Sequence, residues 1–180
     1  MRFIGNIEAR LDAKKRVFVP AVFRRTLLLC QADAANTGNA AETADASQTS
    51  NALQAPNASQ AAANTVLYIR KDVYQNCLVL YPEPVWEAEL SALRASLNKW
   101  VPAQQEVYRQ FLLEAETVEM DAAGRILLPK RLLEMVGIGS QVRFLGVDDT
   151  IEIWPKEALE QPRMAPEEFQ RQLQALLGNQ

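Results

Sequence analysis

A short alternation of apolar and polar residues opens the chain, from Phe3 to Leu11, and predicts a half-buried β-strand. Farther along, apolar residues recur every three or four positions in three stretches, which predicts amphipathic helices. The three stripes consist of Trp86, Leu90, Leu93 and Leu97, then Val107, Phe111 and Ala115 after Pro102, and finally Phe169, Leu173 and Leu176. We expect all three stripes to make core or subunit contacts.

The chain carries an internal repeat. Residues 12–20 (DAKKRVFVP) align with residues 121–129 (DAAGRILLP) at an offset of 109, so that Asp, Ala, Arg and Pro coincide and three apolar residues face three. A second match, residues 78–82 (LVLYP) with 151–155 (IEIWP), has an offset of 73, which is 36 smaller. Two copies of one unit, the first enlarged by an insertion, explain both offsets.

The insertion is visible in the composition at about residues 31–65. This segment is mostly Ala, Asn, Thr, Ser and Gln, with Leu53 as its only large aliphatic residue and no aromatic residue before the closing Thr65. Such a composition cannot bury enough apolar surface to order itself. We expect a flexible surface insertion, and we expect deletion of residues 33–63 to leave folding and binding largely intact.

Each repeat reads as a strand, a turn spanning Asp-x-x-x-Arg, a second short strand, a helix opened by Pro, and a hairpin. In the second repeat the helix is predicted at residues 129–136 and closed by Gly137. Its hairpin is predicted to run over residues 142–147, to turn at 148–149, and to return over 151–154.

Charge and composition narrow the possible functions. The net charge is −3, but residues 1–30 hold seven Lys or Arg against two acids, a local net charge of +5. There is no histidine, and the two cysteines are too few for a metal cluster or a disulfide framework. We predict no catalytic residue, no metal site, no cofactor and no small-molecule substrate. We also see no export signal and no membrane-spanning stretch, so we expect a cytoplasmic protein.

The repeated turn is the main candidate site. Asp12 and Asp121 can accept backbone N–H groups and brace their turns, with Gly124 easing the second one. Arg16 and Arg125 could pair back to these carboxylates or project as donors; spacing alone favours simple braces, because such short patterns recur by chance, and the repetition of the motif shifts the balance toward a functional role. An enzyme using Glu119 and Asp121 as acid and base is a weaker alternative, because no nucleophile or phosphate loop accompanies them.

The first turn adds further positive charge. Arg10, Lys14 and Lys15 surround it, and Arg24 and Arg25 follow soon after, a set suited to phosphate contacts. Together with Arg16 and Arg125, these residues predict a surface that binds double-stranded DNA.

With these motifs in order, the chain resembles the MraZ family of bacterial transcription regulators. The resemblance rests on residues 5–24, with the DAKKRV turn, Pro20, Phe23 and Arg24; on residues 78–86, with Leu-Tyr-Pro and Trp86; and on residues 121–126 and 146–154. It covers nearly the whole chain outside residues 31–65. One departure is Lys15, which stands where the family usually has glycine; if the turn requires a positive φ there, Lys15 is strained by about 1 kcal/mol or more.

The resemblance implies an α+β fold of two pseudo-symmetric AbrB-like swapped-hairpin β units with peripheral helices. It places the first unit at residues 1–86, connecting helices at 87–116, the second unit at 117–160 and a helical tail at 161–180. It further implies a ring-shaped homo-oligomer, associated with the nucleoid, that binds short direct repeats in the promoter of the division and cell-wall gene cluster. The DNA-contacting arginines would be Arg16, with Lys14 beside it, and Arg125. The alternative is an AbrB-like protein-binding module of the antitoxin type.

Overall fold

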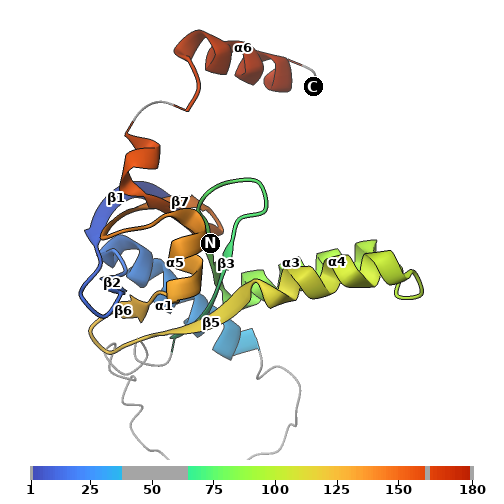
Figure 1. The fold of residues 1–180 in the computed structure, drawn as a ribbon, viewed down its shortest axis with the longest axis horizontal. Coiled ribbons are helices and arrows are strands. Elements are labelled where there is room, and N and C mark those ends of the chain that lie inside the picture. Colours follow the sequence, from blue (N-terminus) through green and yellow to red (C-terminus); the bar gives the residue numbers. More distant parts are fainter. Residues whose placement is uncertain (1, 38–64, 161–162, 179–180) are drawn as a thin grey trace, which may run out of the picture.

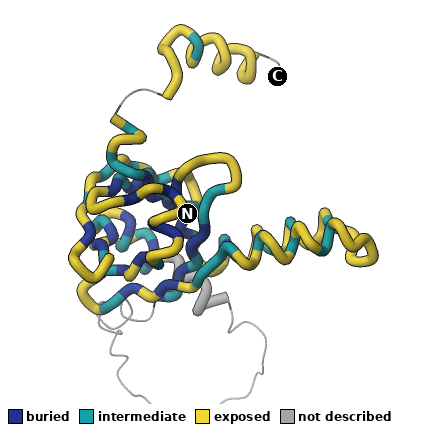
Figure 2. Tube along the Cα trace, viewed as in Figure 1, coloured by how far each residue is buried: buried dark blue, intermediate teal, exposed yellow. Residues whose placement is uncertain are grey.

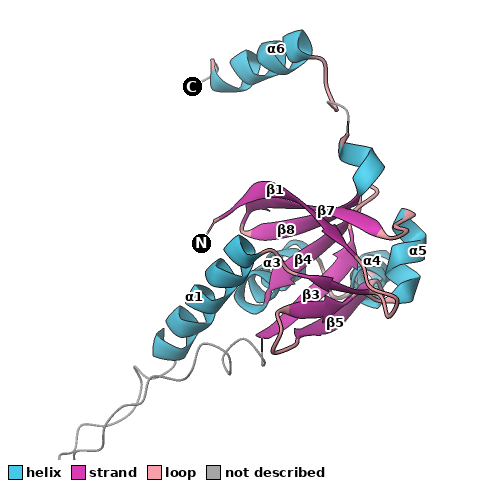
Figure 3. Cartoon of the chain, turned by 90° about the vertical axis from the view of Figure 1, so that its left-hand side faces the viewer, coloured by secondary structure: helices cyan, strands magenta, loops and turns pink. Residues whose placement is uncertain are grey.

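The computed structural model describes residues 2–37, 65–160 and 163–178. An antiparallel sheet forms the body, with helices packed around it and a C-terminal helix standing apart (Figures 1 and 3). The strands are β1 (Phe3–Arg10), β2 (Arg16–Phe18), β3 (Thr65–Lys71), β4 (Leu78–Pro82), β5 (Ala115–Met120), β6 (Arg125–Leu127), β7 (Gln141–Asp148) and β8 (Thr150–Pro155). The helices are α1 (Ala21–Thr37), α3 (Glu83–Ser96), α4 (Pro102–Leu113), α5 (Lys130–Val136) and α6 (Pro166–Leu177), with a 3₁₀ turn, η1 (Lys156–Leu159).

The two repeats exchange their strands within this sheet. Its order is β1-β7-β8-β4-β3-β5-β6-β2, so β1 of the first repeat pairs with β7 of the second, and β5 of the second pairs with β3 of the first. The edge strands β1 and β2 also contact each other, which nearly closes the sheet. If each strand of the first repeat is exchanged with its counterpart in the second, β1 with β5, β2 with β6, β3 with β7 and β4 with β8, the same neighbours recur around the nearly closed sheet. The predicted fold of pseudo-symmetric swapped-hairpin units is therefore confirmed.

One hydrophobic core serves both repeats. Its fully buried side chains include Phe3 and Phe23 from the first repeat and Ile126 and Phe144 from the second. Phe3 and Phe23 meet edge to face, with ring centroids 5.8 Å apart. Because strands of the two repeats alternate and share this core, neither repeat has a hydrophobic core of its own.

The elements predicted for the second repeat match closely. Helix α5 starts after Pro129 and ends at Gly137, whose φ of 72° is the left-handed conformation that closes a helix. Strands β7 and β8 form the predicted hairpin, with Val147 paired to Thr150 across the turn. Helix α1, in contrast, is longer than expected: it continues to Thr37, past the predicted start of the insertion at residue 31. Residues 38–64 of that segment lie outside the described residues.

Helices α3 and α4 form a hairpin that projects from the sheet (Figures 1 and 2). Its base is anchored by aromatic stacking, because Trp86 lies between Tyr68 and Phe111 with centroid distances of 5.3 and 5.7 Å. Arg70, buried on β3, places its guanidinium 3.8 Å from the centre of the Phe111 ring. The expected stripe on α4 stops at Phe111, since Ala115 pairs with Arg70 as the first residue of β5.

The three apolar stripes were expected to make core or subunit contacts, and only part of them packs against other residues of the same chain. Trp86 is buried, Leu90, Leu93 and Leu97 are half-buried, and Val107 is exposed. Helix α6 buries none of its residues against the rest of the described chain, and Phe169, Leu173 and Leu176 all face solvent (Figure 2).

Candidate nucleic-acid interface

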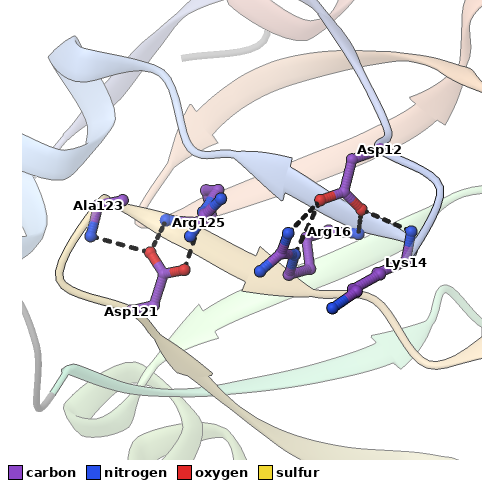
Figure 4. Close-up of polar contacts among 6 residues, drawn as sticks. All are labelled: Asp12, Lys14, Arg16, Asp121, Ala123 and Arg125. Carbon is purple, nitrogen blue, oxygen red and sulfur yellow. Dashed lines mark hydrogen bonds and ion pairs between the residues drawn. The ribbon is translucent and has the colours of Figure 1, made fainter.

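The first turn is closed by Asp12 (Figure 4). One carboxylate oxygen of Asp12 accepts the backbone N–H groups of Lys14 and Arg16 at 2.8 and 2.9 Å. The other accepts the Arg16 side chain, with Nε at 2.8 Å and Nη2 at 2.7 Å. Backbone hydrogen bonds join Asp12 to Arg16 and Lys15 to Asp12. The turn is thus pinned by a single side chain.

The second turn repeats this geometry (Figure 4). Asp121 accepts the N–H groups of Ala123 and Arg125 at 3.0 and 2.9 Å, and Arg125 Nε at 2.8 Å. Each turn is also bonded to the other repeat: Val19 donates its N–H to the Gly124 carbonyl, and Leu128 donates to the Lys15 carbonyl, both at 3.0 Å. The two turns are therefore fixed relative to each other.

Both arginines take the bracing arrangement, in which the guanidinium pairs with its own aspartate rather than projecting freely. They nevertheless remain at the surface, since the Arg16 and Arg125 side chains are 33% and 29% exposed. Of the two alternatives left open by the sequence, the structure shows the brace, with each arginine side chain still partly exposed.

The residue before each arginine has a positive φ. Gly124 has φ 81° and Lys15 has φ 63°. Glycine adopts this region freely, whereas a residue with a Cβ pays about 1–2 kcal/mol. The turn does require a positive φ at Lys15, as the comparison with the family pattern anticipated. The first turn therefore holds a strained lysine where the second holds an unstrained glycine.

Between the turns, β2 and β6 form a short two-stranded ladder with one outward face. Arg16 pairs with Leu127, and Phe18 pairs with Arg125, so all four side chains share the face opposite buried Val17 and Ile126. Phe18 and Leu127 are each 56% exposed, and the Arg125 guanidinium lies 5.6 Å from the Phe18 ring centre. We call these four residues the ladder face.

The two lysines predicted at the first turn bond to Asp12 through their backbone N–H groups and leave their side chains exposed. Lys14 and Lys15 have exposed side chains next to Arg16, and Arg10 is exposed at the end of β1, directly before the turn. The structure thus groups Arg10, Lys14, Lys15 and Arg16 at one end of the ladder and places Arg125 at the other. The exposed apolar pair, Phe18 and Leu127, was not anticipated, although alternation around buried Val17 could have revealed Phe18.

Arg24, which the sequence places soon after the first turn, lies against the second turn in the structure. A Cβ added to Gly124 would lie 2.6 Å from Arg24 Cδ and closer still to its Nη1. A cation of the first repeat therefore covers the turn of the second. The sequence repeat could not show this, because the repeat alignment does not say which helix covers which turn.

Hydrogen bonding keeps both aspartates ionised. The backbone N–H of Arg16 contributes most to lowering the pKa of Asp12, with further help from the Arg16 side chain. Desolvation opposes ionisation of Asp121, but the Arg125 backbone and side-chain donors outweigh it, so the pKa of Asp121 is also lowered. An aspartate held in this form is a poor proton donor, which weakens the alternative of an enzyme built on Glu119 and Asp121.

Two further findings concern the described residues alone. Their His, Cys, Asp and Glu side chains form no group of three or more that could hold a metal ion. No helix among them has the length and apolar character needed to cross a membrane.

The interleaved sheet and the doubled, aspartate-braced turn define this molecule as a pseudo-symmetric AbrB-like swapped-hairpin protein. A family model described as "MraZ protein, putative antitoxin-like" matches residues 111–176.

Curated relatives extend the match to the whole chain. Proteins named "Transcriptional regulator MraZ" from Phocaeicola vulgatus and Bacteroides thetaiotaomicron are 42% and 43% identical over 178 and 180 residues, covering 99% and 100% of this chain and 95% of each relative. One from Bacteroides fragilis is 44% identical over 177 residues, covering 98% of this chain and 92% of the relative. This chain belongs to the MraZ family, and the resemblance stated from its motifs is confirmed.

Proposed function

We propose that this protein is a bacterial transcriptional regulator that binds double-stranded DNA in a sequence-specific way through the ladder face and the first turn. The observation that carries the proposal is the pair of braced arginines on one exposed face, with Arg10, Lys14 and Lys15 clustered at one end of it. The relatives named as transcriptional regulators support the same conclusion. Its place of action is accordingly the cytoplasm, at the nucleoid.

Bracing suits these arginines to reading DNA. A guanidinium has five N–H donors, so an Arg16 that gives Nε and Nη2 to Asp12 keeps others for a nucleic acid. Because the aspartate already fixes the side chain, little rotamer freedom remains to be lost on binding. In this proposal Lys14, Lys15 and Arg10 contact phosphates and supply affinity, while Arg16 or Arg125 reaches a guanine edge and supplies selectivity.

We further propose that several copies assemble into a ring and read short direct repeats upstream of the division and cell-wall gene cluster. One small face makes few contacts, but linked copies raise the effective concentration of each face over neighbouring repeats. The solvent-facing apolar residues of α6 support self-association, since they bury nothing within their own chain.

Two matched substitutions test the role of Arg16. Arg16→Met removes the guanidinium, whereas Asp12→Asn removes the ion pair but keeps an oxygen that can accept the turn's N–H groups. If Arg16 contacts DNA, Arg16→Met weakens binding to a promoter duplex by about 1–3 kcal/mol, while Asp12→Asn weakens it far less, because the guanidinium is retained and a negative charge is lost. Titration by fluorescence anisotropy, with melting temperatures as the folding control, measures both.

Equal losses in the two variants would show that Arg16 serves only as a brace. Unchanged affinity in Arg16→Met would remove it from the interface. For the unaltered protein, the logarithm of the binding constant should fall steeply with the logarithm of salt concentration, by about 0.9 per phosphate contact. A flat response would contradict an electrostatic DNA interface altogether.

A protein-binding module of the antitoxin type remains the second candidate. The matching family is described as antitoxin-like, and α6 presents an apolar stripe that no other described residue covers. In that case purification from the native host should yield a second small protein in fixed stoichiometry. The DNA-binding proposal predicts a single chain type together with steep salt dependence.

A further inference from the structure

The sequence groups Arg24 with the cations that follow the first turn, but the interface proposed above assigns it no contact, and its position in the structure is unusual. It lies in the first turn of α1, where its N–H bonds to the Pro20 carbonyl at 3.0 Å, and its side chain crosses to Gly124 in the other repeat. The helix gains nothing electrostatically from this charge, because positive charge is disfavoured at a helix N-terminus. The reason for an arginine at this position must therefore lie in its contact with the second turn.

Among the described residues, the side chain of Arg24 forms no ion pair with a carboxylate. Its Nε is buried and has no hydrogen-bond partner there. Asp121, the nearby acid of the second turn, is already occupied by Arg125. A half-buried, unpaired arginine costs stability unless something outside the chain supplies the acceptor.

The repeat shows that an arginine is not required for packing here. At the offset of 109 residues, the position equivalent to Arg24 in α5 is Leu133, which is buried and apolar. The same offset sets Lys14 and Lys15 of the first turn against Ala123 and Gly124 of the second. The second turn thus lacks both lysines, and Arg24 brings a positive charge back to it.

Gly124 belongs to this arrangement. Any Cβ at this position would collide with the Arg24 side chain, so the glycine both adopts its positive φ and leaves room for the arginine. In the first turn Lys15 tolerates a positive φ despite its side chain. A residue with a Cβ at 124 would therefore be strained by the positive φ and would require the Arg24 side chain to move.

We propose that Arg24 is a phosphate-binding residue of the second turn, so that the turn formed by residues 121–125 and covered by α1 of the first repeat is a second, composite contact to the DNA backbone. The ligand class is a phosphodiester oxygen, which would accept from the Nη groups of this half-buried side chain, because the Nε is buried and out of reach of an external ligand. This inference rests on the proposed function. Both ends of the ladder face are then cationic. The end that carries Arg125 gains Arg24 from the first repeat.

The test compares Arg24→Gln with Arg109→Gln, a matched loss of one arginine charge at an exposed residue of α4, on the hairpin that projects from the sheet. Binding is measured against salt for a duplex from the promoter upstream of the protein's own gene and for a scrambled duplex of equal length. Arg24→Gln should lower the salt slope by about 0.9 and weaken both duplexes by the same factor, as expected for one lost phosphate contact. Arg109→Gln should leave the slope close to that of the unaltered protein.

Equal slopes for Arg24→Gln and the unaltered protein, or equal reductions in the two variants, would overturn the inference. These outcomes differ from failure of the proposed function, in which the unaltered protein itself binds no duplex with steep salt dependence. Arg24→Lys, which keeps the charge, should restore most of the slope.

A measurement on the unaltered protein avoids the risk that a substitution at 24 impairs folding. The Nε–H resonance of Arg24 should shift in nuclear magnetic resonance spectra as duplex is added, and shift again when salt displaces it. A resonance that stays unchanged while that of Arg16 moves would assign Arg24 to packing alone.

Discussion

Lys15 occupies a backbone conformation that favours glycine, with φ 63°, while its side chain is exposed beside Lys14. The strain has no structural benefit in the described chain, since Gly124 fills the equivalent place in the second turn. A cationic side chain at this point of the surface offers a reason for the cost, because it can contact a phosphate.

Replacing Lys15 with glycine should separate stability from binding. We expect Lys15→Gly to raise the free energy of unfolding by about 1 kcal/mol, or the melting temperature by about 2–4 °C at this chain length. The salt slope of DNA binding should fall by about 0.9. Lys14→Gly is the control, because it removes the same charge without relieving a positive φ; a stability gain of equal size there would refute the strain argument.

The two turn aspartates give a pH prediction with a defined sign. Their pKa values are lowered in the folded protein, so their contribution to stability is complete above the ordinary aspartate pKa of about 3.9 and is lost as the pH falls through the folded values. A titration of the carboxyl carbons by nuclear magnetic resonance should give midpoints below the ordinary value for Asp12 and Asp121.

Arg16→Met should raise the pKa of Asp12 only part of the way back, because the backbone N–H of residue 16 remains as the largest stabilising contact. Asp121 should be unaffected by that substitution. An ordinary midpoint for Asp12 in the unaltered protein would contradict the observed hydrogen bonding.

At the scale of elements, local sequence signals located most of the second repeat correctly. Proline and glycine punctuate α5, and two adjacent aspartates turn the β7–β8 hairpin, so these limits follow from local backbone chemistry. The end of α4 was missed because periodicity alone extends the stripe to Ala115, where pairing with β3 takes over. Tertiary hydrogen bonding of this kind leaves no local signal.

The left-handed end of α5 provides a test of this local chemistry. Gly137→Ala should lower the free energy of unfolding by about 1–2 kcal/mol, because a Cβ is strained at φ 72° even though nothing lies close to it. Gly139→Ala is the matched control, since it also meets open space and lacks a positive φ; its effect should stay within about 0.5 kcal/mol. Chemical denaturation measures both, and equal effects would show that the cap conformation is not what matters.

At the scale of the whole molecule, the doubled motif predicted two equivalent units, but equivalence does not determine which strands pair. The swap was implied by family resemblance, and its consequence for Arg24 could not be read from either source. In a swapped sheet each repeat contacts the other repeat's turn, as the backbone hydrogen bonds from Val19 to Gly124 and from Leu128 to Lys15 show. The sequence therefore predicted the residues of the two motifs. It could not predict contacts between the repeats, such as that of Arg24 with the second turn.

Helix α6 carries the last prediction, which concerns assembly. Phe169, Leu173 and Leu176 lie on one stripe and are 57%, 42% and 74% exposed, an arrangement that favours burial against another copy. Changing all three to serine should reduce the assembly measured by size-exclusion chromatography with light scattering, and should leave the fold of the sheet intact by circular dichroism. Gln174→Ser, a polar change on the same helix, should leave the assembly as it is. Assemblies of unchanged mass in the triple variant would remove α6 from the subunit interface, and the ring would then have to be built through other exposed apolar residues.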